Sequence, residues 1–330
     1  MNNANILQSY LCHFAAILLL VTGLHSHTFA QTFPSKPLRI IAPYTAGGPA
    51  DVISRILAER LESYFQQRVL VENRTGGNAS IGTDFVAKSA SDGYTMLLGA
   101  PAHTANPSLM KSLPYDTEKD FTAVSMVMEQ PMVIAVHHSV PVNSIAELVT
   151  LLKANPTKYN YGTSGAGGPQ HLMAEIFKSA TGTQIQHIPY RGASAAAAAL
   201  VAGDTQISFG TPTNTMPFVK NGQLRALAVS TSKRSPFAPD LPTLNELGFT
   251  NFNYSAWAGI FVPAGTPKDI VNKLHDGLNK ALREKETRDR IFVSGMQSAG
   301  SSSSEEFSQF IKMDITRTAK IIKETGIQPE

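Results

Sequence analysis

The chain has 330 residues, of which 42% are hydrophobic and 16% are charged, and its formal net charge is +3. The apolar content is enough for a core, which excludes a disordered chain, and the length is typical of one large domain or two. The positive charge is small and dispersed, with no basic run longer than Lys233-Arg234, which excludes a nucleic-acid footprint.

The first thirty residues are typical of a secretory signal. An apolar run from Phe14 to Leu24 is shorter than the about 20 residues that a membrane-spanning helix needs, and the small residue Ala30 follows it. No Lys or Arg precedes the run, which departs from the usual pattern, and a buried N-terminal helix is the alternative. We expect cleavage after Ala30, which removes Cys12, the only cysteine, and leaves neither a disulfide nor a thiol nucleophile.

The remaining chain alternates short apolar runs with segments of helical spacing. Three strands and two helices are expected between 38 and 98, and this βαβαβ order is typical of a mostly parallel sheet with helices on its faces. Two amphipathic helices are expected to close the chain, the second with the capping-box spacing of Ser303 and Glu306. The expected strands lie at 38–42, 69–71 and 94–98, within 124–136, and at 159–161, 185–188, 207–209, 224–229 and 257–262.

Three glycine-rich turns join expected strands to expected helices. They run from Pro43 to Asp51, from Gly76 to Gly82 and from Gly162 to Pro169. A helix that begins at such a turn presents free N–H groups and the positive end of its dipole, so an anion binds there without a charged side chain. Ligands of open α/β sheets bind beyond the carboxyl ends of strands, so these turns form the candidate site. Each turn alone is equally compatible with a tight connection that binds nothing.

Other kinds of site match the sequence less well. The segment 162–166 resembles the nucleophile elbow of a serine hydrolase, but Ala166 replaces its last glycine and no His and Asp pair is placed to complete a triad. The glycines that follow depart from a dinucleotide fingerprint at the last position, and there is no Walker A lysine. His171 and Glu175 share a helix face and form at most half of a metal site, so we expect no metal and no cofactor.

A series of short motifs runs in order through the whole expected mature chain. They are KPLRIIAPY at 36–44, Gly47-Gly48 with Asp51, VENR at 71–74, Gly77-Asn78 with Ile81-Gly82, ASDGYT at 90–95, YGTSG at 161–165, His171-Leu172, IPYRG at 188–192 and DLPT at 240–243. Together they resemble the Bug family of extracytoplasmic solute receptors, of the tripartite tricarboxylate transporter type.

The resemblance implies a fold and a division into domains. It implies an α/β type II periplasmic binding protein, with two α/β domains of mostly parallel sheets joined by two crossover strands and a ligand cleft between the domains. After a signal peptide at 1–30, the first domain would comprise 31–133 plus 256–330 and the second 134–255. The crossovers are expected near 132–136 and 254–259.

The resemblance also implies which residues meet the ligand, whose carboxylate would be held mainly by backbone amides and waters at the two glycine turns. Thr45-Ala46 replaces a commoner proline, which leaves open which amides of the first turn point inward. Asn214 is the weakest assignment, because the family often has an acidic residue near it. The expected binding residues are Tyr44, Thr45, Ala46, Gly47, Gly48, Asp51, Asn78, Ala100, Ser164, Gly165, Ala166, Gly168, His171, Tyr190, Arg191, Gly192 and Asn214.

The expected function is capture without chemistry. A periplasmic monomer would close around a small organic acid (a di- or tricarboxylate, an amino acid or an aromatic acid) and dock on membrane permease subunits, with no nucleic acid as partner. Two alternatives remain open: a solute sensor that contacts a signalling membrane protein, and an exported serine hydrolase that uses Ser164. Side chains such as Tyr44 and His103 are expected to set specificity, but the sequence does not say for which acid.

Overall fold

The computed structural model describes residues 33–165, 167–190, 192–250 and 252–327. The expected signal peptide and its cleavage site at Ala30 lie outside these residues, as do two of the expected binding residues, Ala166 and Arg191. The chain divides into a unit at 1–35 and a unit at 36–330, and the account below concerns the second unit. None of the helices in the described part of the chain is long and apolar enough to cross a membrane.

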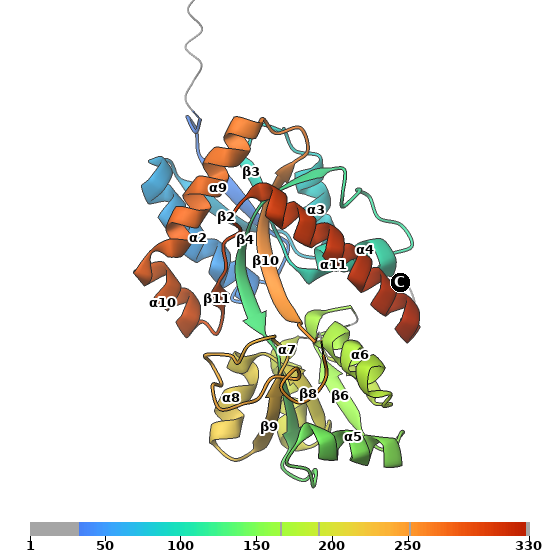
Figure 1. The fold of residues 1–330 in the computed structure, drawn as a ribbon. Helices are drawn as coiled ribbons and strands as arrows, with labels where there is room; N and C mark the ends of the chain where they lie inside the picture. The colour runs from blue at the N-terminus through green and yellow to red at the C-terminus, as the bar shows by residue number, and fades with distance from the viewer. Residues whose placement is uncertain (1–32, 166, 191, 251, 328–330) are drawn as a thin grey trace, which may run out of the picture. The chain divides into compact units, whose positions relative to one another are not determined.

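One sheet has six strands in the order β11-β4-β10-β3-β1-β2 (Figure 1). Strands β1, β2 and β3 are parallel, and Ile40 of β1 pairs with Val71 on one side and Met96 on the other. Strands β4, β10 and β11 are antiparallel to their neighbours. The bounds are β1 Leu38–Ala42, β2 Val69–Asn73, β3 Thr95–Gly99, β4 Phe121–Pro131, β10 Ser255–Pro263 and β11 Gln297–Ser298.

The other sheet has five strands in the order β7-β6-β8-β5-β9. Strands β6, β7 and β8 are parallel to one another. Strand β5 is antiparallel to both of its neighbours, β8 and the edge strand β9. Each sheet therefore has a parallel part, where helices connect successive strands, and an antiparallel part. The bounds are β5 Val133–His137, β6 Asn160–Thr163, β7 Gln186–Pro189, β8 Ile207–Gly210 and β9 Leu224–Val229.

Helices cover both sheets, and their bounds are α2 Pro49–Phe65, α3 Ser80–Ala87, α4 Pro101–Leu109, α5 Ile145–Ala154, α6 Pro169–Thr181, α7 Ala193–Ala202, α8 Pro212–Lys220, α9 Lys268–Arg283, α10 Lys285–Val293 and α11 Ser304–Thr325. The long C-terminal helix α11 contacts β4 and α4, and also α6 beside the second sheet. Its Ile322 belongs to the same apolar cluster as Leu172 and Phe177 of α6. Helix α11 therefore packs against elements of both sheets.

The chain passes between the two sheets at two points, which a single buried serine ties together. Met132 separates β4 from β5, and Tyr254 precedes β10. The Ser230 hydroxyl accepts from the Met132 amide at 2.9 Å and donates to the Tyr254 carbonyl at 2.5 Å. The Ser230 amide donates to the Met132 carbonyl at 3.0 Å, and the Tyr254 amide donates to the Ser230 carbonyl, also at 3.0 Å.

Several sequence predictions are confirmed and others need correction. The expected strands are present, and the Ser303 side chain accepts from the Glu306 amide as the capping box requires. The apolar stretch 124–136, expected to contain strand material, falls in β4 and β5, which Met132 separates at the passage between the sheets. Three helices were not expected: α4, α8 and α10. Two of them begin at a proline and contain a second proline, a composition that normally predicts loops.

Candidate ligand-binding site

The first glycine turn joins β1 to α2 and is fixed by the side chain of Asp51. Asp51 Oδ2 accepts from the Gly47 amide at 2.9 Å. The carboxylate also accepts from Arg55 Nε at 3.0 Å and from Asn73 Nδ2 at 2.9 Å. Burial opposes its charge, but these hydrogen bonds outweigh burial and lower the pKa of Asp51. Asp51 is buried beneath the turn, whereas Thr45, Ala46 and Gly47 are exposed.

Other expected residues of the first sheet gather at the same edge. Burial raises the pKa of Tyr44, Tyr115 adds to the effect, and the nearby amide of Ala100, the residue that precedes α4, opposes it. The Asn78 side chain donates to Asn106 Oδ1 of α4 at 2.8 Å, and Asn106 donates back to the Asn78 carbonyl at 2.9 Å. The structure therefore brings Tyr44, Asn78 and Ala100 together around α4.

The second glycine turn joins β6 to α6, and side chains accept from three of its amides. The Ser164 amide donates to Gln170 Oε1 at 2.9 Å, the Gly165 amide to Thr163 Oγ1 at 3.2 Å, and the Gly167 amide to His171 Nδ1 at 3.0 Å. Gly168 caps α6 with an extended backbone, and Pro169 begins the helix without an N–H group. The amides of the first helical turn have no partner inside the helix, so they remain available to an anion.

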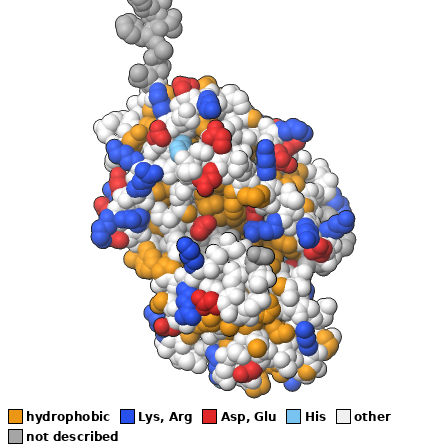
Figure 2. Space-filling model, viewed as in Figure 1, with side chains coloured by type: hydrophobic (Ala, Val, Ile, Leu, Met, Phe, Trp, Pro, Cys, Tyr) orange, Lys and Arg blue, Asp and Glu red, His pale blue; other side chains and the backbone are white. Residues whose placement is uncertain are grey.

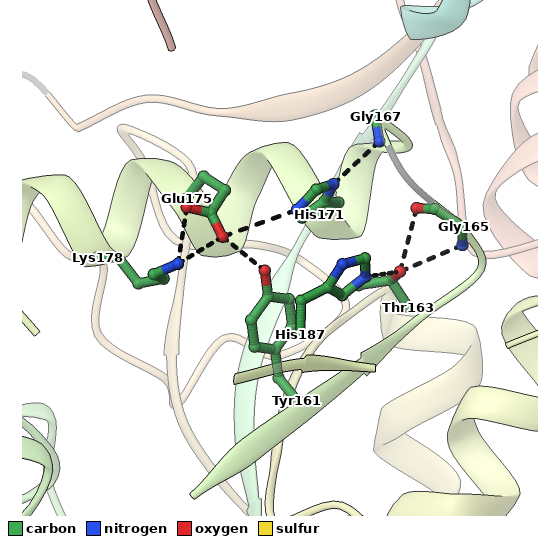
Figure 3. Close-up of polar contacts among 8 residues, drawn as sticks. All are labelled: Tyr161, Thr163, Gly165, Gly167, His171, Glu175, Lys178 and His187. Carbon is green, nitrogen blue, oxygen red and sulfur yellow. Dashed lines mark hydrogen bonds and ion pairs between the residues drawn. The ribbon is translucent and has the colours of Figure 1, made fainter. Parts of the chain in front are cut away.

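A buried polar network lies behind this second turn (Figure 3). Glu175 Oε1 accepts from the Tyr161 hydroxyl and from Lys178 Nζ, each at 2.7 Å, and lies 3.7 Å from His171 Nε2. The His187 ring stacks on His171 with centroids 4.0 Å apart. Burial, the neighbouring His187 and Lys178 together lower the pKa of His171 to about 3, so its ring is neutral near pH 7.

The remaining expected residues of the second sheet also lie at the carboxyl ends of its parallel strands. The Tyr190 amide donates to the Thr163 carbonyl at 2.8 Å, and Gly192 precedes α7. Asn214 lies in the first turn of α8 and, with Gln170, lines a small cavity of about 10 Å³. This arrangement places Tyr190, Gly192 and Asn214 beside the second turn.

Helix α4 links the two groups of residues. Its first turn follows Ala100, whose amide lies near Tyr44, and its last residue, Leu109, abuts Gly167 so closely that a Cβ on this glycine would overlap Leu109 Cδ1. Nine helical residues span about 13 Å at 1.5 Å per residue. A segment that the sequence did not identify as a helix therefore lies beside residues of both glycine turns.

His103, which the sequence suggested as a specificity residue, lies inside the protein. It is 2% exposed and its ring packs against Phe121 and Phe261. Burial lowers the pKa of His103 to about 3, so the ring is neutral and neither ring nitrogen has a hydrogen-bond partner among the described residues. His103 therefore contributes to the core of the first sheet.

A surface hollow of about 770 Å³ is lined by Lys36, Lys88, Arg74 and Phe85, among others, and by no residue of the two Gly-Gly-Pro turns. Three of its cations are paired: Lys36 with Asp92 at 3.1 Å, Lys88 with Asp84 at 2.7 Å and Arg74 with Glu72 at 2.6 Å. Over the face shown in Figure 2, basic and acidic side chains are interspersed in the same way. The described residues contain no cluster of three or more His, Cys, Asp or Glu side chains that could hold a metal ion.

A family model for the tripartite tricarboxylate transporter family receptor matches residues 53–327 of the chain. The chain belongs to this receptor family. BugT from Bordetella pertussis is 34% identical over 312 residues, which cover 94% of this chain and 95% of BugT.

Solved structures agree with this assignment. The structure of the periplasmic binding protein BugD is 31% identical, with a TM-score of 0.76, over 90% of this chain and all of BugD. That of R. palustris Rpa4515 with adipate is also 31% identical, with a TM-score of 0.79 and the same coverage. The predicted fold class, an α/β periplasmic binding protein, is confirmed, and the members compared with this receptor are solute-binding proteins.

Sequence reasoning missed the network behind the second turn. Tyr161 and His187 come into contact because β6 and β7 pair in the register that places these two residues opposite one another. Nothing in the sequence specifies that register. The sequence does contain one signal for the two turns themselves, because Ala-Gly-Gly-Pro occurs at 46–49 and again at 166–169.

Proposed function

We propose that this receptor is exported to the periplasm, with its signal peptide cleaved after Ala30, and captures a small dicarboxylate. The observation that carries the proposal is the pair of Gly-Gly-Pro turns, Gly47-Gly48-Pro49 and Gly167-Gly168-Pro169, each at the N-terminus of a helix and beyond parallel strands. Helix N-termini bind anions through backbone N–H groups, so two of them suit a ligand with two carboxylates. The adipate in the structure of Rpa4515 supports this ligand class.

The proposal assigns the capture to closure of two domains, 31–133 plus 256–330 and 134–255. The Met132, Ser230 and Tyr254 contacts support this division, because the chain passes between the sheets only where these residues lie together in the described part of the protein. A ligand that contacts both turns would shift the population toward the closed form. The closed monomer would then deliver the acid to the membrane permease subunits of a tripartite tricarboxylate-type transporter.

A thermal-shift panel on refolded, ligand-free mature protein tests the ligand class. The panel holds dicarboxylates including adipate, tricarboxylates, aromatic acids and acidic amino acids at matched pH and ionic strength. A ligand at 100 times its dissociation constant adds about 2.7 kcal/mol to the free energy of unfolding, which raises Tm by a few degrees for a chain of this size. We expect dicarboxylates to give the largest shift, and no shift from any acid contradicts the proposal.

Trp257 offers a direct test of closure, because it is the only tryptophan of the chain and lies in β10, three residues beyond Tyr254. Its Nε1 donates to Asp314 Oδ2 of α11 at 3.1 Å. We expect adipate to change its fluorescence with the same saturation curve as the thermal shift.

A serine hydrolase instead predicts turnover that is lost in Ser164→Ala, whereas a receptor shows none. The two histidines near Ser164 bond Gly167 and Thr163, and this observation does not favour the hydrolase.

A further inference from the structure

The two glycine turns share a hydrogen-bond clasp, in which a side chain accepts from the amide of the first glycine of the turn. In each, the amide of the first glycine donates to a side chain four residues later: Gly47 to Asp51 at 2.9 Å, and Gly167 to His171 at 3.0 Å. Both first glycines have a positive φ, 78° and 69°, and both second glycines are extended, with φ of −78° and −70°. Asp51 and His171 are therefore equivalent positions in two copies of one backbone motif.

The two clasps carry different charges. Asp51 is a carboxylate that pairs with Arg55 and accepts a hydrogen bond from Asn73. His171 accepts at Nδ1, so its single ring proton is on Nε2, on the opposite side of the ring from Gly167 (Figure 3). The nearest carboxylate, Glu175, faces that Nε2 and pairs with Lys178.

The ring that stacks on His171, His187, bonds to Thr163 at the end of β6. The Thr163 hydroxyl donates to the Gly165 carbonyl at 3.1 Å, so at its 2.7 Å contact with His187 Nε2 the ring must donate. A proton on Nε2 alone leaves the stacked His187 ring neutral. Burial lowers the pKa of His187 and so favours this neutral form. The titratable and charged groups around His171 are thus Tyr161 on β6, His187 on β7, and Glu175 and Lys178 on α6.

We propose that His171 is a positioning residue of the second turn, which holds the Gly167 amide as a neutral acceptor and so keeps negative charge away from the backbone groups that meet the ligand. The proposal rests on the proposed function, because it assumes an anionic ligand. A carboxylate at this position would make the same hydrogen bond but repel the ligand. On this view, position 171 contributes to affinity without touching the ligand.

Two variants of nearly equal shape separate the hydrogen bond from the charge. In His171→Asn an amide oxygen replaces Nδ1, and in His171→Asp a carboxylate oxygen does so. The Kd for adipate is measured by calorimetry at pH 7 and pH 8, well above the range in which carboxylic acids titrate. Hydrogen exchange of the Gly167 amide is followed by NMR in the same samples, and Asp276→Asn, which changes a carboxylate that is 71% exposed on α9, is the control.

We expect His171→Asn to bind adipate within about threefold of the parent at every pH, because it preserves a neutral acceptor. We expect His171→Asp to bind at least about tenfold more weakly at both pH values, because an aspartate is ionised throughout this range. Gly167 exchange should remain slow in both, and the affinity of Asp276→Asn should not change. Equal affinities of His171→Asn and His171→Asp at pH 8 overturn the proposal.

The outcome in which no acid binds the parent protein contradicts the proposed function and is distinguishable from failure of this inference. In that case His171→Ala is compared with His171→Asn by exchange alone. We expect Gly167 exchange to accelerate at least about tenfold in His171→Ala and not in His171→Asn. Unchanged exchange in His171→Ala shows that His171 does not position the turn.

Discussion

The two sheets present the same backbone turn in different surroundings. The first turn is exposed over Thr45, Ala46 and Gly47, and the ion pair behind it has its cation, Arg55, 55% exposed. The second turn is backed by Glu175, which is 4% exposed, and by Lys178, which is 20% exposed. A short motif thus specifies the shape of each turn, whereas residues far away in sequence decide how much that shape depends on buried polar contacts.

The ion pairs behind the turns should differ most in the cost of removing the cation. Lys178→Met leaves the buried Glu175 carboxylate without its charge partner, and we expect a loss of about 3–5 kcal/mol in the free energy of unfolding. Arg55→Gln removes a largely exposed cation, while Asp51 keeps its bonds from Gly47 and Asn73, so we expect about 0–1 kcal/mol. Urea denaturation of both variants checks the difference. Equal losses would mean that the second network is no more buried in solution than the first.

The first glycines should differ in the same direction. Alanine at 167 meets Leu109 and must also adopt a positive φ, so we expect Gly167→Ala to lose about 2–4 kcal/mol and most of its affinity for adipate. Alanine at 47 has the same φ problem but open space around it, and we expect about 1–2 kcal/mol. Thermal unfolding and adipate titration of the two variants provide the measurement. A larger loss for Gly47→Ala is incompatible with the packing described here.

Ser230 offers a change that should affect both turns alike. Ser230→Ala leaves the Met132 amide and the Tyr254 carbonyl without their hydroxyl partner, and we expect a loss of about 1–3 kcal/mol. Because the passage between the sheets lies outside both turns, Gly47 and Gly167 amides should keep their parental exchange relative to one another. Ser235→Ala, another buried serine of the second half, is the control. An effect confined to one turn would refute the connection role of Ser230.

Acid should weaken the second turn before the first. The pKa of His171 is lowered from about 6.5 to about 3, so the neutral ring favours the folded state above pH 6.5, and this contribution is lost as pH falls from there toward 3. The loss is about 1.4 kcal/mol per pH unit for one such group. Asp51, whose pKa is lowered, contributes stability above its unfolded value near 4 and loses it only below.

Chemical denaturation between pH 7 and pH 4.5 measures this slope. Since His103 has the same lowered pKa, we expect His171→Asn to remove only part of the slope and His103→Leu to remove another part. A slope that His171→Asn leaves unchanged would show that the ring is already charged, or already exposed, in the folded protein.

The sequence predicted the strands, the parallel parts of both sheets and the two glycine turns, because apolar runs and Gly-Pro pairs act locally. It did not predict α4, since Pro101, Pro107 and the polar residues between them carry no helical signal, and tertiary contacts such as Asn106 with Asn78 stabilise the helix. It identified His171 and Asp51 as site residues but not their orientation toward the backbone. That orientation depends on turn geometry and on the pairing of Tyr161 with His187.

The contacts of Ser230 with Met132 and Tyr254 also have a consequence for how the chain is organised. The segment 133–253, which contains the whole five-stranded sheet, leaves at Met132 and returns at Tyr254, and Ser230 bonds to both. Its two ends are thus neighbours, as the ends of an inserted module must be. In these terms the five-stranded sheet is a domain inserted into the chain of the six-stranded sheet. A short peptide joining 131 to 255 would therefore restore a continuous chain for the six-stranded sheet.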